Sequence, residues 1–315
     1  MPLIRDKLAI LVNHCHALDC DDLVLGRRVK MKAPAFAYCK AATLEDALQF
    51  LDRYGDAARL LAGGQSLLPA LNLRLTHPQC LIDIGELAEL RGEKLAGSVI
   101  ELGALTTHRA LSCSAMVREH LPLLAMAVPY VAHAAIRNRG TIGGSLALAD
   151  PAAEYPAVAL ACEARMRLRS VRGERQVKAS DYFQGLYQTV LASDEILCAV
   201  EFPIARPNER FGFQELARRH GDYAMAGLAA RIQVTEDNRV EQAHLAFFAL
   251  GDRPILAQRA CACLIGQTID PGVIRKAQQA LDEDLSPPDD FQAKASTKLH
   301  WAKVLLGRVL SSLAS

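Results

Sequence analysis

The sequence lacks an excess of charge of either sign, a long apolar run and the residue pattern of a secretory signal. Its 315 residues include 36 Lys and Arg against 35 Asp and Glu, so no net charge favours nucleic acid or an anionic membrane. No apolar run reaches the roughly 18 residues of a membrane span. The first residues lack the basic, apolar and small-residue order of a secretory signal. We therefore expect a cytoplasmic protein without a membrane span, long enough for two or three domains.

Paired cysteines are also missing. The nine cysteines are scattered and mostly lie in apolar segments, which is typical of free thiols in a reducing compartment. No Cys-x-x-Cys pair is present, which argues against an iron–sulfur cluster or a structural zinc ion on this chain. The group around His14, Cys15 and Cys20 matches no usual zinc spacing. We interpret residues 1–30 as an N-terminal extension before a domain that starts near Met31.

Common signatures of catalysis and nucleotide binding are absent as well. The sequence has no Gly-x-Gly-x-x-Gly, no P-loop, no Gly-x-Ser-x-Gly elbow and no His-Glu-x-x-His. His77, His108 and His133 fall in or near apolar segments and are interpreted as structural. We predict no catalytic acid, base or nucleophile, a composition that suits a redox cofactor with its own chemistry.

Two glycine loops, at residues 61–69 and 136–147, are the most informative features present. Each places a Gly-Gly pair one or two positions before a serine. Without Cβ atoms, consecutive backbone N–H groups can turn toward one anion, and a helix that starts there adds its positive end. Two such loops could hold the pyrophosphate of a dinucleotide, although each alone is more often a structural turn. Arg137 and Arg139 beside the second loop could bind phosphate or stay in solvent.

Two further segments hold polar residues near these loops. Asp150 could accept hydrogen bonds from ribose or ribityl hydroxyls, or it could cap the next helix. Glu154 follows it and offers a second carboxylate. Residues 218–224 place Tyr223 after Arg, His, Gly and Asp. This tyrosine fits either a ring laid against a planar cofactor or a polar hairpin with one amphipathic side chain.

Hydrophobic spacing predicts an α/β region first. Residues 36–85 follow the order strand, helix, strand, loop, helix, strand, with Thr43 as N-cap and Gly55 as the end of the first helix. The second helix is expected to start beside Ser66, its cap. We expect that helix to face a core through four leucines: Leu67, Leu68, Leu71 and Leu75.

Less regular elements follow, and then a change of architecture. Strands are predicted at 99–102, 165–169 and 195–202, and residues 121–135 predict one apolar helix. Pro203 and Pro207 bracket a boundary. Three strand-like runs within residues 210–250 precede helices over 256–313, which predicts a separate α+β domain.

Taken together, three motifs carry a resemblance to a known family. They are residues 62–66 (Ala-Gly-Gly-Gln-Ser), 141–145 (Thr-Ile-Gly-Gly-Ser) and 221–224 (Gly-Asp-Tyr-Ala). In order and spacing the chain resembles, over about residues 31–312, the FAD-binding medium subunit of molybdenum hydroxylases. This is the family of carbon monoxide dehydrogenase and xanthine dehydrogenase.

The resemblance implies a fold of the α+β class. A two-lobed FAD-binding domain of the vanillyl-alcohol oxidase (PCMH) type would span residues 31–205, with lobes of about 31–85 and 86–205. A C-terminal domain with a three-stranded antiparallel sheet and helices would span 206–315. FAD would lie extended between the domains, with its pyrophosphate on the backbone of residues 63–66 and 141–145. The residues implied at the cofactor are Ala62, Gly63, Gly64, Gln65, Ser66, Leu67, Thr141, Ile142, Gly143, Gly144, Ser145, Asp150, Asp222 and Tyr223.

The resemblance also implies a role and partners. A large molybdopterin subunit would oxidise the substrate, and a small subunit with two [2Fe–2S] clusters would pass the electrons on. The FAD of this chain would hand them to an external acceptor, within an assembly expected to be a dimer of heterotrimers. The alternatives are a self-sufficient FAD-dependent oxidoreductase of the same fold and a scaffold subunit that has lost its cofactor.

Two differences between this sequence and the family's pattern change what the resemblance implies. Gln65 stands where related chains often carry His, which excludes a covalent histidyl–flavin link there and favours noncovalent FAD. Relatives that reduce aromatic thioesters hold an extra cluster through an inserted group of cysteines. No such group is present in this sequence, so that subtype is disfavoured.

Overall fold

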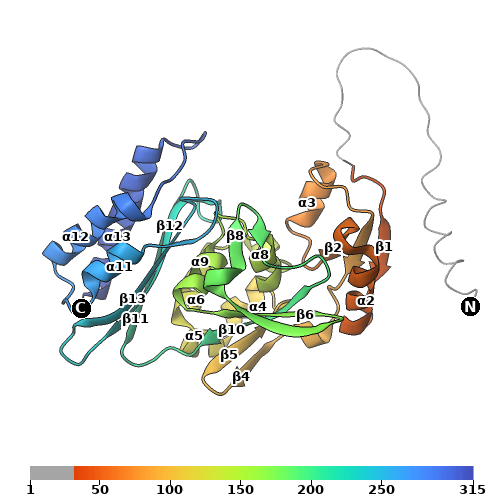
Figure 1. The fold of residues 1–315 in the computed structure, drawn as a ribbon, viewed down its shortest axis with the longest axis horizontal. Coiled ribbons are helices and arrows are strands. Elements are labelled where there is room, and N and C mark those ends of the chain that lie inside the picture. Colours follow the sequence, from red (N-terminus) through yellow and green to blue (C-terminus); the bar gives the residue numbers. More distant parts are fainter. Residues whose placement is uncertain (1–31, 315) are drawn as a thin grey trace, which may run out of the picture. The chain divides into compact units, whose positions relative to one another are not determined.

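The N-terminal layer of the fold is a small parallel sheet. The computed structural model describes residues 32–314, so the predicted extension at residues 1–30, with His14, Cys15 and Cys20, lies outside them. Strands β1 (Ala37–Lys40), β3 (Cys80–Asp83) and β2 (Ala58–Leu61) pair in parallel in that order. Helices α2 (Leu44–Tyr54) and α3 (Leu67–Asn72) connect them (Figure 1). The predicted α/β order is confirmed.

The signals at the ends of α2 act as the sequence predicts. The Thr43 hydroxyl accepts the Asp46 amide, and the Asp46 carboxylate accepts the Thr43 amide, which completes a capping box. Gly55 ends the helix at φ 48°, a left-handed conformation that favours glycine. The cap fixes where α2 starts, so its apolar face meets the sheet.

The leucine face predicted for α3 is wrong in part. Only Leu71 is buried, whereas Leu68 and Leu75 are 42% and 76% exposed. The helix ends at Asn72, so Leu75 lies beyond it and is not part of its face. Ser66 precedes it without making a side-chain cap, so its predicted capping role is also wrong.

A five-stranded antiparallel sheet forms the middle of the described chain. Its order is β4 (Glu93–Ala96), β5 (Val99–Gly103), β10 (Ile196–Pro203), β6 (Arg165–Ser170) and β7 (Gly173–Lys178). The predicted strands β5, β6 and β10 are confirmed. Strand β7 had no sequence prediction because it lies at the sheet edge and its side chains are mostly exposed.

The predicted helix over residues 121–135 is wrong, because the chain breaks there. It forms α6 (Pro122–Ala127), a 3-10 turn (Val128–Tyr130) and α7 (Ala134–Arg137). Pro129 has no N–H for an α-helical bond, and Ala132 turns the backbone at φ 48°. The break redirects the chain into the second glycine loop.

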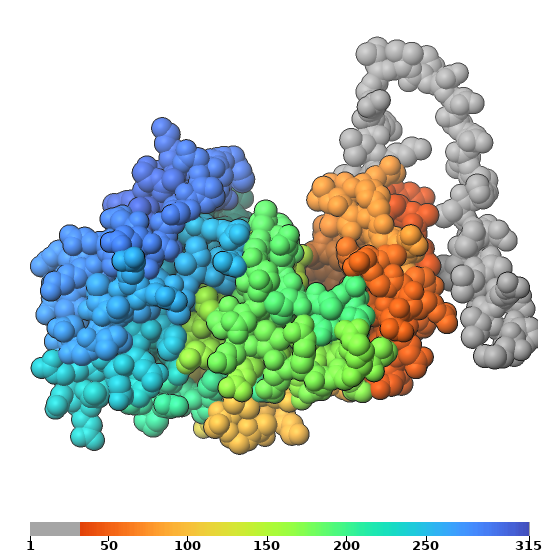
Figure 2. All heavy atoms as spheres, viewed as in Figure 1, coloured from red at the N-terminus to blue at the C-terminus, as the bar shows by residue number. Residues whose placement is uncertain are grey.

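The other helices and a hairpin cover the middle sheet. They are α4 (His108–Cys113), α5 (Ala115–His120), α8 (Ile142–Leu148), α9 (Glu154–Ala161), α10 (Ala179–Tyr182) and the hairpin β8 (Phe183–Gly185) to β9 (Gln188–Thr189). Short 3-10 turns lie at Gly55–Ala57 and Ala88–Leu90. Figure 2 shows the surface indented between the orange N-terminal layer and the green residues of this middle region.

The C-terminal part is an antiparallel sheet with helices on one face. Its three long strands are those predicted: β11 (Glu209–Ala217), β12 (Ala224–Val234) and β13 (Val240–Phe248). The two-residue β14 (Ile255–Leu256) extends the edge. One face packs on α11 (Gln258–Leu264) and α13 (Ala295–Leu313), with α12 (Pro271–Asp284) against both (Figure 1).

The other face of that sheet packs on α6 and α9 of the middle region. A buried ion pair reinforces this junction: the Arg231 guanidinium lies 2.7 Å from Glu209 Oε1 and 3.0 Å from Glu163 Oε2. The Ala249 amide also donates to the Pro151 carbonyl at 2.7 Å. Within residues 32–314, no helix is long and apolar enough to cross a bilayer.

Candidate functional site

The two glycine loops, far apart in the chain, lie against each other. A Cβ built on Gly63 would stand 2.1 Å from the Arg139 carbonyl oxygen and 3.0 Å from the Gly140 Cα. A side chain at Gly63 is therefore excluded by backbone rather than by a movable group. The absence of Cβ at Gly63 is what lets the loops meet, so a single ligand can touch both.

The first loop offers a row of unpaired amides. Residues 63–67 donate no backbone hydrogen bond to any other described residue, and the next amide, that of Leu68, returns to the Gly64 carbonyl. Gly64 adopts φ 72°, which bends the row. Successive N–H groups in such a bend form a concave site for an anion. The Gln65 side chain bonds back to the Gly63 carbonyl at 3.1 Å and steadies the loop.

The amides of the second loop, in contrast, are used within the protein. Helix α8 starts after Thr141, whose hydroxyl accepts the Gly144 amide at 3.1 Å. The Ile142 and Gly143 amides donate to the carbonyls of Thr106 and Ala104. The backbone grip expected from residues 141–145 is thus not available at 142–144. The groups left to meet a ligand are the Cα of the exposed Gly144 and the hydroxyl of the half-buried Ser145.

Neither Arg137 nor Arg139, the two arginines beside the second loop, makes a buried contact that would hold it as a phosphate ligand. Arg137 Nη1 donates to the carbonyls of Val131 and Ala132 and so closes the break after α6. Arg139 is exposed to solvent. This arrangement supports the solvated and structural interpretations of these two side chains.

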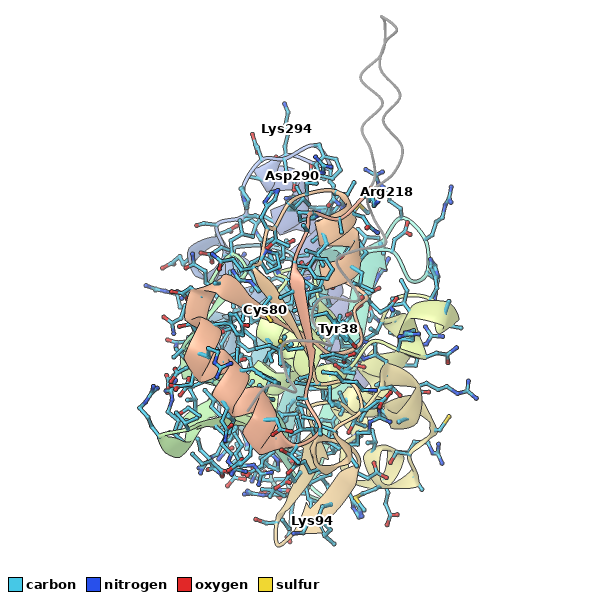
Figure 3. The ribbon with its side chains drawn as sticks, turned by 90° about the vertical axis from the view of Figure 1, so that its right-hand side faces the viewer. Tyr38, Cys80, Lys94, Arg218, Asp290 and Lys294 are labelled. Carbon is cyan, nitrogen blue, oxygen red and sulfur yellow. The ribbon has the colours of Figure 1, made fainter. Side chains whose placement is uncertain are left out.

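The Gly-Asp-Tyr segment packs just upstream of the second loop. Gly221, at φ 86°, has no room for a side chain because a Cβ would lie 2.7 Å from His133 Nδ1. The His220 ring stacks on Tyr130 at 5.8 Å between centroids. Both contacts hold the turn in place, while Tyr223 at its end stays 65% exposed. Arg218 lies 5.9 Å from the Phe291 ring, and Figure 3 shows it toward the same end of the view as Asp290.

Asp150 does not cap a helix. Helix α9 begins at Glu154 with Ala153 as N-cap. The Asp150 carboxylate accepts the Ala152 amide at 2.9 Å and the Tyr187 hydroxyl at 3.3 Å. Burial, which dominates over these two bonds, raises the pKa of Asp150. Both carboxylate oxygens are thus already engaged inside the protein.

Glu154 is the carboxylate with spare bonding capacity. It is 7% exposed, and its carboxyl bonds to no other side chain among residues 32–314. Burial and the charge of Asp150 raise the pKa of Glu154 to about 7. Glu215, whose Oε2 is buried without a partner, has its pKa raised to about 8 by burial and by Glu154. Burial, Asp150 and Glu154 raise the pKa of Tyr223 as well, so these groups share one region.

The two raised carboxyl pKa values predict a stability that falls as pH rises. Each native carboxyl keeps its proton above the ordinary value of 4.5, so the folded state binds more protons up to about pH 7 and pH 8. Burial lowers the pKa of His108 from 6.5 to about 4, so the folded state binds fewer protons there than the unfolded state between these values. The stability contributed by this group therefore rises with pH, but only up to about pH 6.5. Urea unfolding of the cofactor-free protein should therefore give a lower free energy of unfolding at pH 8 than at pH 6.5.

Variants assign that pH dependence to the two groups. Glu215→Gln and Glu154→Gln should each flatten the decrease between pH 6.5 and 8, since each removes one ionisation. The exposed Glu283, which pairs with Arg259 at 2.6 Å, provides the control, and Glu283→Gln should keep the slope of the unmodified chain. An equal slope in all four proteins would contradict the assignment.

Three groups in this region had no functional prediction from sequence: Tyr187, Glu215 and His108. Tyr187 lies at a hairpin tip and Glu215 in a strand, and nothing in the local pattern separates them from ordinary surface residues. His108, interpreted as structural, is buried with Nδ1 unpaired beside the Tyr155 ring, whose hydroxyl is also unpaired. Their environments arise from contacts between distant segments.

Comparison with known proteins agrees with this geometry. Residues 34–205 match the model of the FAD binding domain in molybdopterin dehydrogenase. Residues 211–313 match that of the CO dehydrogenase flavoprotein C-terminal domain. The chain is 37% identical to the nicotine 6-hydroxylase medium subunit of Paenarthrobacter nicotinovorans, over 89% of this chain and 98% of that one. It is 33% identical to the carbon monoxide dehydrogenase medium chain of Hydrogenophaga pseudoflava, over 90% and 98%.

Solved structures give the same result. Carbon monoxide dehydrogenase from Hydrogenophaga pseudoflava superposes with a TM-score of 0.86 at 34% identity, covering 89% of this chain and 97% of that one. Quinoline 2-oxidoreductase from Pseudomonas putida 86 superposes with a TM-score of 0.85 at 38% identity, covering 90% and 98%. The chain therefore belongs to the family of FAD-binding medium subunits of molybdenum hydroxylases and is an oxidoreductase component.

Proposed function

We propose that this chain carries noncovalent FAD and transfers electrons within a molybdenum hydroxylase complex. It takes them from the [2Fe–2S] clusters of a small partner subunit, while a large molybdopterin subunit oxidises the substrate. An external acceptor then receives them. The observation that carries the proposal is the contact of Gly63 with Arg139 and Gly140, which joins the two loops at one place.

The residues present fit FAD. The unpaired amides of residues 63–67 suit the pyrophosphate, since their N–H groups meet no acceptor in the described chain. Glu154 suits a hydroxyl donor such as the ribityl chain, because its carboxyl is buried without a side-chain partner. Tyr223 lies near the same carboxylates, since burial and then Asp150 and Glu154 raise its pKa, and Asp222 directly precedes it. We assign FAD binding to residues 31–205 and a supporting role to residues 206–315.

Bound FAD supplies one- and two-electron redox chemistry, and the protein supplies position and environment. The packed loops, joined where Gly63 meets Arg139 and Gly140, would hold the phosphates of the cofactor. Burial disfavours the charged forms of Glu154 and Glu215 and raises their pKa values to about 7 and about 8. Each of these two carboxyls therefore carries less than a full negative charge near neutral pH.

Gly144→Val is expected to weaken FAD binding by at least about tenfold. A Cβ at Gly144 meets only the Thr141 hydroxyl at 2.9 Å and otherwise points into open space, where the cofactor would approach. Titration of the cofactor-free chain with FAD measures the effect, and thermal unfolding without FAD checks the fold. Gly64→Val is a poorer test because φ 72° strains any branched residue there. Undiminished FAD affinity in Gly144→Val would contradict the proposed site.

The role in electron transfer is tested on the native complex. Purification should yield this chain together with iron–sulfur and molybdopterin subunits, with a flavin absorbance spectrum and with iron and molybdenum by metal analysis. Reduction by substrate should bleach the flavin only when the partners are present. A solitary chain that turns over substrate completely would overturn the assignment as an electron-transfer subunit.

A further inference from the structure

Tyr187 is held in an unusual position beside the candidate site. It lies at the tip of the β8–β9 hairpin with φ 54°, a left-handed conformation that is uncommon for a bulky side chain. Such a conformation costs free energy and persists where surrounding contacts fix it. Strained residues of this kind cluster at binding and catalytic sites, so the contacts that hold Tyr187 identify what the strain serves.

The hairpin is fixed from two sides. At its tip, the Tyr187 hydroxyl donates to Asp150 Oδ2 at 3.3 Å. At its base, Arg253 Nη1 from the C-terminal part donates to the Gln184 carbonyl at 3.0 Å. The hairpin also contacts α8, the helix of the second glycine loop. The tip is therefore set relative to both parts that would enclose FAD.

The ring of Tyr187 remains available although its hydroxyl is engaged. The residue is 55% exposed, close to the 65% of Tyr223. Burial, and then Asp150, raise the pKa of Tyr187 to about 12, and Tyr223 contributes to that rise. Asp150 acts on the pKa of Tyr223 too. Two half-exposed tyrosine rings thus lie near one buried carboxylate, which suits a flat aromatic ligand between or against them.

We propose that Tyr187 contacts the isoalloxazine ring of FAD through its exposed face, and that Asp150 is a positioning residue that acts through Tyr187. This inference rests on the proposed function. It gives Asp150 a different role from a direct acceptor of cofactor hydroxyls, since its Oδ2 accepts the Tyr187 hydroxyl and its Oδ1 the Ala152 amide, so that it holds the hairpin tip. The strained backbone at Tyr187 is then the cost of directing one ring onto the cofactor.

The test uses the full chain, freed of flavin and titrated with FAD. Tyr187→Ala should weaken binding about tenfold, the size of one lost aromatic contact, and should raise the fluorescence of the bound flavin because a quenching ring is gone. Tyr187→Phe keeps the ring and should retain most of the quenching. The adjacent Leu186 is 57% exposed in the same turn, and Leu186→Ala should match the unmodified chain in both measurements.

A double-mutant cycle separates the roles of Asp150. Asp150→Asn should alter affinity and fluorescence as Tyr187→Phe does, and the double variant should add nothing, since both changes break one contact. Additive losses would show that Asp150 binds FAD directly and would overturn the positioning role. Unchanged affinity and fluorescence in Tyr187→Ala would overturn the ring contact.

Two further measurements keep these outcomes distinct. Ultraviolet titration of the cofactor-free chain should show one tyrosine ionising at lower pH in Asp150→Asn, because a negative neighbour and hydrogen-bond acceptor is lost. Absence of that change would contradict the Tyr187–Asp150 contact without reference to FAD. Failure of the unmodified chain to bind FAD would instead refute the proposed function, and this inference with it.

Discussion

Gly63→Ala is expected to abolish tight FAD binding, with a loss of affinity of at least about 100-fold. The added methyl carbon would stand 2.1 Å from the Arg139 carbonyl oxygen and 2.8 Å from its carbon. Both are backbone atoms, so no side-chain rotation relieves the overlap. The loops must separate, and the unpaired amides of the first loop then lose their place beside the second loop at Arg139 and Gly140.

The stability of the Gly63→Ala protein should fall much less than its affinity. Overpacking of one methyl group typically costs about 1–3 kcal/mol, and these loops lie at the surface of the fold. Calorimetry without FAD and fluorescence titration with FAD provide the two values. Gly272→Ala is the matched control, because its Cβ meets only the end of the flexible Asp270 side chain, at 3.0 Å. Equal FAD affinities of the two variants would refute the convergence of the loops as the basis of binding.

Arg231→Met is expected to give the largest loss of stability, about 3–5 kcal/mol. The side chains of Arg231 and Glu209 are 8% and 2% exposed, and two of their atoms lie 2.7 Å apart. Removal of the guanidinium leaves the Glu209 carboxylate buried without its counter-ion. The third partner, Glu163, is 56% exposed and can be hydrated instead.

Two comparisons make this prediction specific. Arg231→Met/Glu209→Gln should recover much of the loss, since no uncompensated charge then remains in the interior. Arg259→Met removes an ion pair whose members are both 64% exposed, and it should change the free energy of unfolding by less than about 1 kcal/mol. Denaturant unfolding of the four proteins provides the values. An Arg231→Met protein as stable as Arg259→Met would contradict the importance of burial at this junction.

Local elements were predictable because their causes lie within a few residues. The capping box at Thr43, the left-handed glycine at Gly55 and the long C-terminal strands follow from side-chain type and spacing alone. The failures have two causes. The break between α6 and α7 has a local one, Pro129, which apolar periodicity does not weigh. The exposure of Leu68 and Leu75 depends on which surfaces meet, and periodicity does not report that. Figure 3 labels a comparable case, Tyr38, which is half exposed on β1 yet bonded to Asp83 across the sheet.

The candidate site divides in the same way. The sequence by itself determined that glycine pairs, a Gly-Asp-Tyr turn and two carboxylates follow one another in a fixed order, and this order identified the family. Only the tertiary structure decided that Gly63 packs on Arg139 and that the amides of the second loop bond within the protein. It also decided that Asp150 holds Tyr187, while the Glu154 carboxyl bonds to no other described side chain. The physical reason is that a residue type sets which bonds a group can make, whereas long-range packing sets which partners and how much water it meets.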